Sequence, residues 1–344
     1  MPLVFGTLVH SCLEEFYKGN FIHEGLITEW EEGMSKKLSE CEQEGLQDQV
    51  SFDEEAIEKA SELARSMMSR YIDKYQGDMG DWVILGTEVV FDIPLSNTLA
   101  PGWRLTGAID LLVYEPSSNR IIVIDHKTTA AYSPQAAKRT YEMSPQSWAY
   151  LYAIRTAMYS DSDDISISVD RNKLAEFKDK APQIGFLYNF LRKKIPSVPK
   201  VLKNGTISKA SCDTTYKVFT NALRDANQVF TDYEDQLAML SKKGDAFLFR
   251  VDTQPQSSVI EQWLSDAVAV TKEIDAGHEA NAWRRSTNQC NPLGRRCEFL
   301  DICVDPYGGI DDEERIQLMF NEIGGEGPVE IQQESTSGIA PAPF

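Results

Sequence analysis

Two apolar segments in the middle of the chain, residues 106–114 and 121–129, have the composition of paired β-strands. Ile, Val, Leu and Tyr dominate both segments, and the six residues between them, 115–120, are rich in turn formers. A hairpin of this kind returns the end of its second strand to the beginning of its first. The pattern therefore predicts that Asp110 and Asp125 come close together.

Apolar positions at helical spacing predict the elements around this hairpin. A helix is expected over residues 6–16, with one packed face formed by Leu8, Cys12, Leu13 and Phe16. Ser144 and Pro145 suit the cap and the first turn of another helix. We also expect a strand at 82–91, two charged helices at 23–77, an insertion loop at 158–170, and helices at 213–242 and 255–278 around a short strand at 246–251.

The polar residues of the two central strands point to metal-dependent chemistry. Asp125 and Lys127 are separated by one residue and therefore lie on the same face of their strand. Two carboxylates can bind Mg²⁺ with water positions left open, and the cation lowers the pKa of a bound water. Lys127 can orient that water or neutralise charge on the phosphorane. The alternative is a surface hairpin with an ordinary ion pair.

Two predicted helices carry further polar residues at a spacing of one turn. His10 lies one turn before Glu14, and Gln146 lies four residues before Tyr150 on the same helical face. A lone helical histidine is equally compatible with a solvated or core-satisfied ring. The second pair is compatible with a capped helix that buries an aromatic ring. Their order along the chain gives these residues their significance.

Taken in order, four motifs make the chain resemble the RecB-type nucleases of the PD-(D/E)xK superfamily. They are G-x-x-x-H at 6–10, G-x-I-D at 107–110, D-x-K at 125–127 and Q-x-x-x-Y at 146–150, so the resemblance covers residues 6–152. It implies that His10, Asp110 and Asp125 bind Mg²⁺ or Mn²⁺, with the backbone carbonyl of His126 as a further ligand. It also implies a catalytic set of Asp110, Asp125, Lys127, Gln146 and Tyr150, in which the last two position the substrate.

The same resemblance implies an α/β fold with a restriction-endonuclease-like core. We expect a mixed central sheet around the 104–126 hairpin, flanked by the helices that carry His10 and Gln146. Helical insertions and a cysteine-rich C-terminal segment complete the expected fold. Glu88 matches an acidic position often present before the hairpin, and we take its role as structural.

The expected nuclease domain covers residues 1–304. Within it, we expect an acidic helical insertion at 21–77 and a cysteine knot at 280–304. Residues 305–344 are acidic and rich in Gly, Pro and Ser, a composition that cannot bury a core. We therefore expect this tail to be disordered.

Three of the six cysteines, Cys290, Cys297 and Cys303, lie within fourteen residues. We find no secretory signal, so metal ligation is favoured over disulfides. The spacing resembles the C-terminal knot of the AddB-like and CRISPR-associated iron–sulfur exonucleases, which implies a 4Fe–4S cluster. That subfamily takes a fourth cysteine from before the G-x-x-x-H helix, where this chain has only five residues. We expect truncation at the start; another fourth ligand, zinc and free thiols are the alternatives.

The formal net charge of −19 contrasts with the basic surface of a DNA-binding protein. Residues 21–60 carry −9 and residues 305–344 carry −8, so the remainder of the chain is close to neutral. The segment 188–209 has six bases and no acids, and its Tyr188 and Phe190 favour stacking of single-stranded bases, with a solvated loop as the alternative. We expect DNA contacts from Arg192, Lys193, Lys194, Arg295 and Arg296.

These expectations converge on a Mg²⁺- or Mn²⁺-dependent deoxyribonuclease, an exonuclease in DNA recombination, repair or phage DNA processing. DNA is then the partner, and unwinding requires a separate helicase or recombinase chain because no G-x-x-x-x-G-K-S/T motif occurs. No apolar run is long enough to span a membrane, and we expect a cytoplasmic protein. The alternatives are a catalytically inactive DNA-binding or end-recognition module of the same fold, and an RNA or nucleotide hydrolase.

Overall fold

The computed structural model describes residues 2–43, 52–130, 134–141, 144–160, 162–178 and 183–280. The chain divides into two compact units, Met1–Asp275 and Ala276–Phe344, and the site described below belongs to the first. No helix in the described ranges combines the length and the apolar character that crossing a membrane requires. The predictions made for the three clustered cysteines, for Arg295 and Arg296 and for the acidic tail fall outside the described residues.

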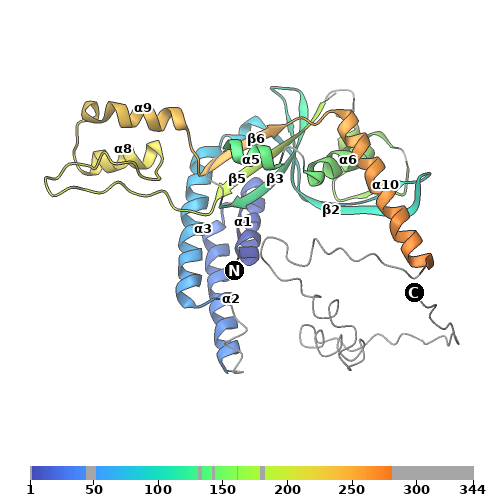
Figure 1. Cartoon of the computed structure of the whole chain (residues 1–344), viewed down its shortest axis with the longest axis horizontal. Coiled ribbons are helices and arrows are strands. Elements are labelled where there is room, and N and C mark those ends of the chain that lie inside the picture. Colours follow the sequence, from blue (N-terminus) through green and yellow to red (C-terminus); the bar gives the residue numbers. More distant parts are fainter. Residues whose placement is uncertain are drawn as a thin grey trace, which may run out of the picture. The chain divides into compact units, whose positions relative to one another are not determined.

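A six-stranded mixed sheet forms the centre of the first unit (Figure 1). Its strands are β1 (Val83–Ser96), β2 (Ala100–Glu115), β3 (Arg120–Thr129), β4 (Ser166–Ile167), β5 (Gln183–Arg192) and β6 (Leu248–Thr253). They lie in the order β4-β1-β2-β3-β5-β6, in which only β3 and β5 are parallel neighbours among the described strands. The predicted α/β fold, mixed sheet and central hairpin are therefore confirmed, and the arrangement is consistent with a restriction-endonuclease-like core.

One face of the sheet is covered by α1 (Pro2–Tyr17), α2 (His23–Gln43) and α3 (Glu54–Tyr75). The predicted apolar face of α1 is confirmed, because its four members, Leu8, Cys12, Leu13 and Phe16, are all buried. Asp53 caps α3, and its side chain accepts a hydrogen bond from the Ala56 backbone N–H at 2.8 Å. The short helix α4 (Asp78–Asp81) then leads into β1.

Helix α6 (Pro145–Tyr159) packs on the opposite face, together with residues of α5 (Pro134–Tyr141), α7 (Arg171–Ala175) and α10 (Ser257–Ala280). Strand β3 is buried on both faces, since Ile121 and Val123 pack with α6 whereas Ile122 and Ile124 pack with α1 and α3. The alternation places the next residues in the same way. Asp125 and Lys127 follow the α6 face, and the residue between them follows the α1 face.

The segment between β5 and β6 forms a small helical unit with its own apolar cluster. It contains α8 (Tyr216–Asp225), the 3₁₀ helix η2 (Phe230–Tyr233) and α9 (Glu234–Lys243). Phe219, Leu223, Tyr233 and Leu240 form the buried centre of this cluster. The helices and the short strand predicted for residues 213–278 are thus confirmed in kind and order.

The β1–β2 ladder is distorted at the position of Asp110. Glu88 of β1 lies opposite Asp110 of β2 in the register. It has a φ of 45°, in the left-handed region that non-glycine residues rarely occupy. Ile109 and Leu111 share a face in a regular strand, yet here they belong to different buried clusters. The irregularity therefore coincides with two facing carboxylates.

The structure differs from the sequence prediction at two strands of the sheet, β5 and β4. Residues 183–192, which include the start of the basic segment, form strand β5, and Tyr188 and Phe190 are fully buried. The prediction that these rings stack on bases is wrong, because they pack in the core against α6. Within the predicted insertion loop, Ser166–Ile167 add a short edge strand to β1.

Candidate functional site

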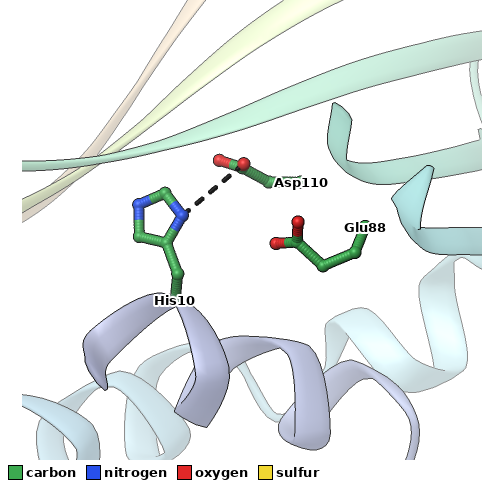
Figure 2. A group of neighbouring side chains, drawn as sticks. All are labelled: His10, Glu88 and Asp110. Atoms are coloured by element: carbon green, nitrogen blue, oxygen red, sulfur yellow. Dashed lines mark ion pairs between the residues drawn. The ribbon is translucent and has the colours of Figure 1, made fainter. Parts of the chain in front are cut away.

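Three side chains that could hold a metal ion come together from α1, β1 and β2. They are His10, Glu88 and Asp110, and one ligand atom of each lies within 4.8 Å of the others. His10 Nδ1 is 3.5 Å from Asp110 Oδ1. Figure 2 shows the three side chains directed toward one another from a helix and two strands. The structure thus joins two residues of the predicted metal set and adds Glu88.

A hard divalent cation fits this donor set. In an octahedral site with bonds near 2.1 Å, ligand atoms stand about 3 Å apart when adjacent and about 4.2 Å apart when opposite. The three atoms, within 4.8 Å of one another, need only small side-chain shifts to reach such spacings. Carboxylate oxygens suit Mg²⁺ and Mn²⁺, whereas an imidazole nitrogen also suits transition metals. The donor set is therefore compatible with Mg²⁺ or Mn²⁺ but less selective for them than an all-oxygen site.

The electrostatics of the three residues favour an added positive charge. Burial by itself lowers the pKa of His10, but its hydrogen bond with Asp110 and the nearby carboxylates raise it above the ordinary value. Burial opposes ionisation of Asp110, yet the contact with His10 lowers its pKa overall. Burial and the charges of Asp110 and Glu14 raise the pKa of Glu88. Glu88 is therefore the carboxylate whose charge is least compensated.

A chain of hydrogen bonds connects β3 to α6 beside these ligands. Lys127 Nζ donates to Asp125 Oδ1 at 3.0 Å and to Gln146 Oε1 at 2.9 Å. Gln146 Nε2 in turn donates to the Tyr150 hydroxyl at 3.0 Å. The side chain of Lys127 is 24% exposed and that of Asp125 only 2%. Two motifs that are separate in the sequence thus meet around one ammonium group.

Asp125 is a buried carboxylate with incomplete compensation. Burial raises its pKa to about 6, with the charge of Asp110 adding to this effect and Lys127 opposing it. Asp125 Oδ2 lies 2.8 Å from Lys127 Nζ but makes no well-oriented hydrogen bond within the described part of the chain. Burial also lowers the pKa of Lys127, but its contacts with Asp125 raise it overall. The Asp125 oxygen is suited to a cation.

His126, between Asp125 and Lys127, joins the site to the opposite side of β3. Its backbone N–H donates to Asp110 Oδ2 at 2.5 Å. Its ring Nδ1 lies 2.8 Å from Asn189 Nδ2. Burial lowers the pKa of His126 to about 3, so the ring is neutral and Nδ1 accepts the amide hydrogen bond. This residue contacts a candidate metal ligand on one side and a buried polar cluster on the other.

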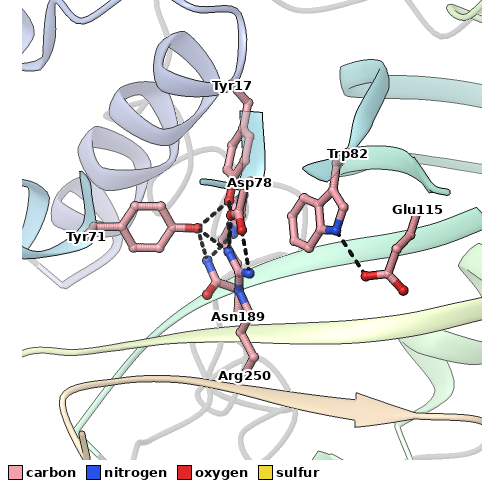
Figure 3. Close-up of polar contacts among 8 residues, drawn as sticks. Tyr17, Tyr71, Asp78, Trp82, Glu115, Asn189 and Arg250 are labelled. Atoms are coloured by element: carbon pink, nitrogen blue, oxygen red, sulfur yellow. Dashed lines mark hydrogen bonds and ion pairs between the residues drawn. The ribbon is translucent and has the colours of Figure 1, made fainter. Parts of the chain in front are cut away.

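We call this second group, drawn in Figure 3, the support cluster. Tyr17 donates to Asp78 Oδ2 at 2.7 Å, and its hydroxyl lies 2.7 Å from that of Tyr71. Tyr71 accepts from Asn189 at 2.8 Å. Arg250 forms a bidentate ion pair with Asp78, with Nη1 at 2.9 Å from Oδ1. The support cluster, His126, Tyr17, Tyr71, Asp78, Asn189 and Arg250, connects α1, α3, α4, β3, β5 and β6.

Helix α1 belongs to both groups. It carries His10, a candidate metal ligand, and two turns further on it carries Tyr17, whose ring stacks on that of His126. The ring centroids are 5.9 Å apart, and the planes differ by 9°. This ring contact links α1 to β3, and the His126 backbone N–H, which donates to Asp110, links β3 to β2. We refer to His10, Glu88, Asp110, Asp125 and Lys127 as the site cluster.

A cavity of about 620 Å³ gives access to the site cluster. Its walls come from α1, from Glu88 of β1, and from the residues at the ends of β3 and β5. The lining residues are Gly6, Thr7, His10, Ser11, Glu14, Glu88, Thr128 and Lys193. Two potential metal ligands therefore face a space that a substrate can enter.

The structure separates the three consecutive bases at the end of β5, Arg192, Lys193 and Lys194, into two kinds. Arg192 is only 9% exposed, and Asp213 binds its guanidinium with two hydrogen bonds of 2.9 and 2.7 Å. Lys194 contacts the same carboxylate at 2.9 Å. Lys193 instead lines the cavity. The expectation of a DNA contact is therefore corrected for Arg192, whose side chain has a structural partner.

Sequence reasoning treated Glu88 as structural and did not find the support cluster. The signal for Glu88 is its register opposite Asp110 together with its unusual φ, and neither is visible in the sequence. Gly107 of the G-x-I-D motif has a packing reason, because an added Cβ would lie 2.7 Å from the Phe91 ring. Motif glycines of this kind mark close approaches that only the fold reveals.

Comparison with known families gives one result that covers most of the chain. The family model of the PD-(D/E)XK nuclease superfamily matches residues 1–304. Comparisons with curated proteins and with solved structures give no match. The matched region contains both the site cluster and the support cluster.

Proposed function

The chain belongs to the PD-(D/E)XK nuclease superfamily, and from this membership we propose that it is a metal-dependent exonuclease acting on DNA. The observation that carries the proposal is that Asp110 pairs with His10, which lines the cavity, while Asp125 interacts electrostatically with both residues and holds Lys127. These groups come from three separate elements. Two buried carboxylates, an imidazole and an ammonium with shifted pKa values beside a cavity are typical of a catalytic site.

In this proposal His10, Asp110 and Asp125 hold Mg²⁺ or Mn²⁺, and Glu88 joins them. The raised pKa values of Asp125 and Glu88, both caused mainly by burial, favour a cation at this place. The bound cation supplies Lewis acidity for the scissile phosphate and lowers the pKa of a water molecule. The chain's own residues set the ligand geometry, since the Asp110 carboxylate is held by the His126 N–H.

Lys127 acts on the reacting phosphate. Its ammonium is held between Asp125 and Gln146, and Tyr150 fixes the Gln146 amide through the hydrogen bond at 3.0 Å. Three donors on one ammonium leave one hydrogen for the attacking water or for a phosphate oxygen. Gln146 and Tyr150 are thus positioning residues, and Lys127 is the residue that contacts the substrate.

DNA as the substrate, cleavage from its ends and a role in recombination, repair or phage DNA processing extend this proposal. The near-neutral remainder of the chain and the cavity lysine support a nucleic acid ligand. We further propose that Cys290, Cys297 and Cys303 hold an iron–sulfur cluster and that Arg295 and Arg296 contact DNA. Iron, sulfide and zinc analysis of anaerobically purified protein tests the first point. A separate helicase or recombinase chain is the proposed partner.

Digestion of end-labelled DNA tests the main proposal. Wild-type protein with Mn²⁺ should degrade linear DNA and spare covalently closed circles, and Asp125→Ala and Lys127→Ala should abolish degradation while DNA binding persists. Asp92→Ala, which removes an exposed carboxylate paired with Arg104, serves as the control. Failure of iron-reconstituted wild-type protein to cut any DNA would favour an inactive binding module. Faster cleavage of a matched RNA would favour a ribonuclease.

A further inference from the structure

Lys193 is the one base among the residues that line the cavity. Its backbone N–H donates to the Thr129 carbonyl at 2.8 Å, which holds it beside the end of β3. Within the described ranges its ammonium has no ion pair and no hydrogen bond. A half-buried lysine without a partner, next to carboxylates that it does not contact, is available for an external anion.

The neighbouring bases show why Lys193 is free. Asp213 forms ion pairs with both Arg192 and Lys194. The chain bends between these two residues, since the Lys194 backbone N–H donates to the Arg192 carbonyl at 2.7 Å. The Arg192 guanidinium also lies 4.8 Å from the centroid of the Phe247 ring. Lys193, at the bend, lines the cavity instead. The local fold thus uses two bases for structure and presents the third to the site.

Hydroxyl groups complete this wall of the cavity. Ser11 lies on α1 one residue after His10, and Thr128 lies on β3 one residue after Lys127. Gly6 leaves the space beside Thr128 open, because an added Cβ would be in van der Waals contact with the Thr128 hydroxyl oxygen, at 3.7 Å. One ammonium and two hydroxyl donors form a set that binds a phosphate group.

We infer that Lys193, Ser11 and Thr128 bind the phosphate next to the one that is cleaved, on the same strand. Ser11 and Thr128 line the same cavity as His10 and Glu88, so a phosphate held by them lies beside the proposed cation site. The inference rests on the proposed function and names the contact that sets the position of the strand. Lys193 is a positioning residue for the substrate, and it supplies no group to bond breaking.

A binding experiment tests this without cleavage. Fluorescence anisotropy in EDTA measures the Kd of a labelled oligonucleotide for wild-type protein, Lys193→Gln and Lys194→Gln. Both variants lose one positive charge, one residue apart, so a general charge effect is the same in each. Lys193→Gln is expected to raise Kd roughly tenfold, the effect of one charge-assisted contact, and Lys194→Gln by less than about twofold. Only Lys193→Gln should lower the slope of log Kd against log salt, by about 0.7 to 0.9.

Uncharged linkages locate the phosphate. Oligonucleotides with one methylphosphonate at each of the terminal linkages in turn should bind wild-type protein more weakly at one position. With the methylphosphonate at that position, Lys193→Gln should cause no additional loss of affinity, because the phosphate charge that Lys193 contacts has already been removed. Lys193→Arg should restore part of the affinity. If Lys193 instead binds a terminal phosphate, a 5′ or 3′ phosphate should raise the affinity of wild-type protein, and Lys193→Gln should remove that gain. This result would overturn the assignment to an internal linkage.

The outcomes distinguish this inference from the proposed function. Equal Kd values and salt slopes for Lys193→Gln and Lys194→Gln, with wild-type protein active, overturn the inference alone. An inactive wild-type protein overturns the proposed function, while the binding comparison still decides the role of Lys193. Thermal unfolding of Lys193→Gln should match wild type, because its side chain has no partner among the described residues.

Discussion

The site cluster and the support cluster are both polar groups along β3, but they are built in opposite ways. In the support cluster, Asp78 is fully matched by Arg250 and Tyr17, and its residues lie between elements of the core. In the site cluster, the pKa of Asp125 is raised by burial despite its ion pair with Lys127, and Glu88 has a raised pKa beside an accessible cavity. A buried charge that is paired with its counter-charge stabilises a fold, whereas carboxylates with raised pKa values beside a cavity are suited to a ligand.

The support cluster explains how the strained site cluster can persist. Packing carboxylates together and holding Glu88 in the left-handed region both cost free energy. The support cluster fixes α1 against β3 and so keeps His10 and Asp110 in place. Substitutions in the site cluster should therefore affect mainly activity, and substitutions in the support cluster mainly stability.

The largest effect is expected from Asp110→Asn. Loss of the charge at this ligand should lower kcat about a thousandfold or more, comparable with removing one electrostatic stabiliser. The free energy of unfolding should change by no more than about 1 kcal/mol, because the amide retains the shape and can still accept from the His126 N–H. Urea unfolding and DNA digestion are measured on the same preparation. A loss of about 3 kcal/mol in the free energy of unfolding would instead show that Asp110 is also needed for stability, which contradicts the assigned division between the two clusters.

The second effect is expected from Arg250→Met. Removal of the guanidinium leaves Asp78 buried without its bidentate partner, which should cost about 3 to 5 kcal/mol of unfolding free energy. Below the unfolding transition, kcat should fall by less than about tenfold, because Arg250 contacts no member of the site cluster other than through the support residues.

The matched control is the double variant Asp78→Asn/Arg250→Met. A neutral amide no longer needs a cation, so the double variant should be more stable than Arg250→Met alone. Urea unfolding measures both. Equal stability of the single and double variants would show that the loss comes from packing of Arg250 on the Tyr75 ring, 3.8 Å away, and not from the ion pair.

How far the sequence predicted these two clusters follows from where their members lie. The hairpin, the apolar face of α1 and the spacing of Asp125, Lys127, Gln146 and Tyr150 are local patterns, and each was readable from periodicity. That the D-x-K and Q-x-x-x-Y segments meet could be expected from the family resemblance, and the hydrogen bond between Lys127 and Gln146 now gives its geometry.

The support cluster could not be read from the sequence, because its members are far apart along the chain. Tyr17 and Arg250 are 233 residues apart, and Asn189 and His126 are 63 residues apart. The sequence predicts single-stranded base stacking in the segment 188–209 because its bases are interleaved with Tyr188 and Phe190, whereas residues 188–192 belong to β5. Their parallel pairing with β3 depends on tertiary contacts that no local pattern encodes.

A third effect is expected in the pH dependence of stability. The folded-state pKa of His126, about 3, lies below its ordinary value of 6.5. Between these pH values the unfolded chain binds a proton at His126 that the folded chain does not bind. The free energy of unfolding therefore falls as the pH decreases through this window. The folded-state pKa of Asp125, about 6, lies above its ordinary value of 3.8, so stability falls as the pH rises through that window. Between about pH 4 and pH 6 the two contributions oppose each other.

Variants separate the two contributions. Asp125→Asn should steepen the loss of stability on acidification, by at most about 1.4 kcal/mol per pH unit. His126→Gln should change the slope by a similar amount in the opposite direction, and its amide can still accept from Asn189. Urea unfolding in EDTA across this pH range measures both slopes against wild type. Parallel curves for the two variants would contradict the assignment of opposite pKa shifts to neighbouring residues.

The smallest effect is expected from the same substitution at a tyrosine of the support cluster and at Tyr150, which lies beside the site cluster. Tyr71→Phe removes a buried hydroxyl that accepts from Asn189 and contacts Tyr17, and it should cost about 1 to 3 kcal/mol of stability with activity nearly unchanged. Tyr150→Phe removes a partly exposed hydroxyl that holds Gln146, and it should leave stability within about 0.5 kcal/mol of wild type. Its kcat should fall because Gln146 no longer fixes Lys127. If Tyr71→Phe instead reduced kcat as much as Tyr150→Phe, the support cluster would be part of the catalytic apparatus rather than its foundation.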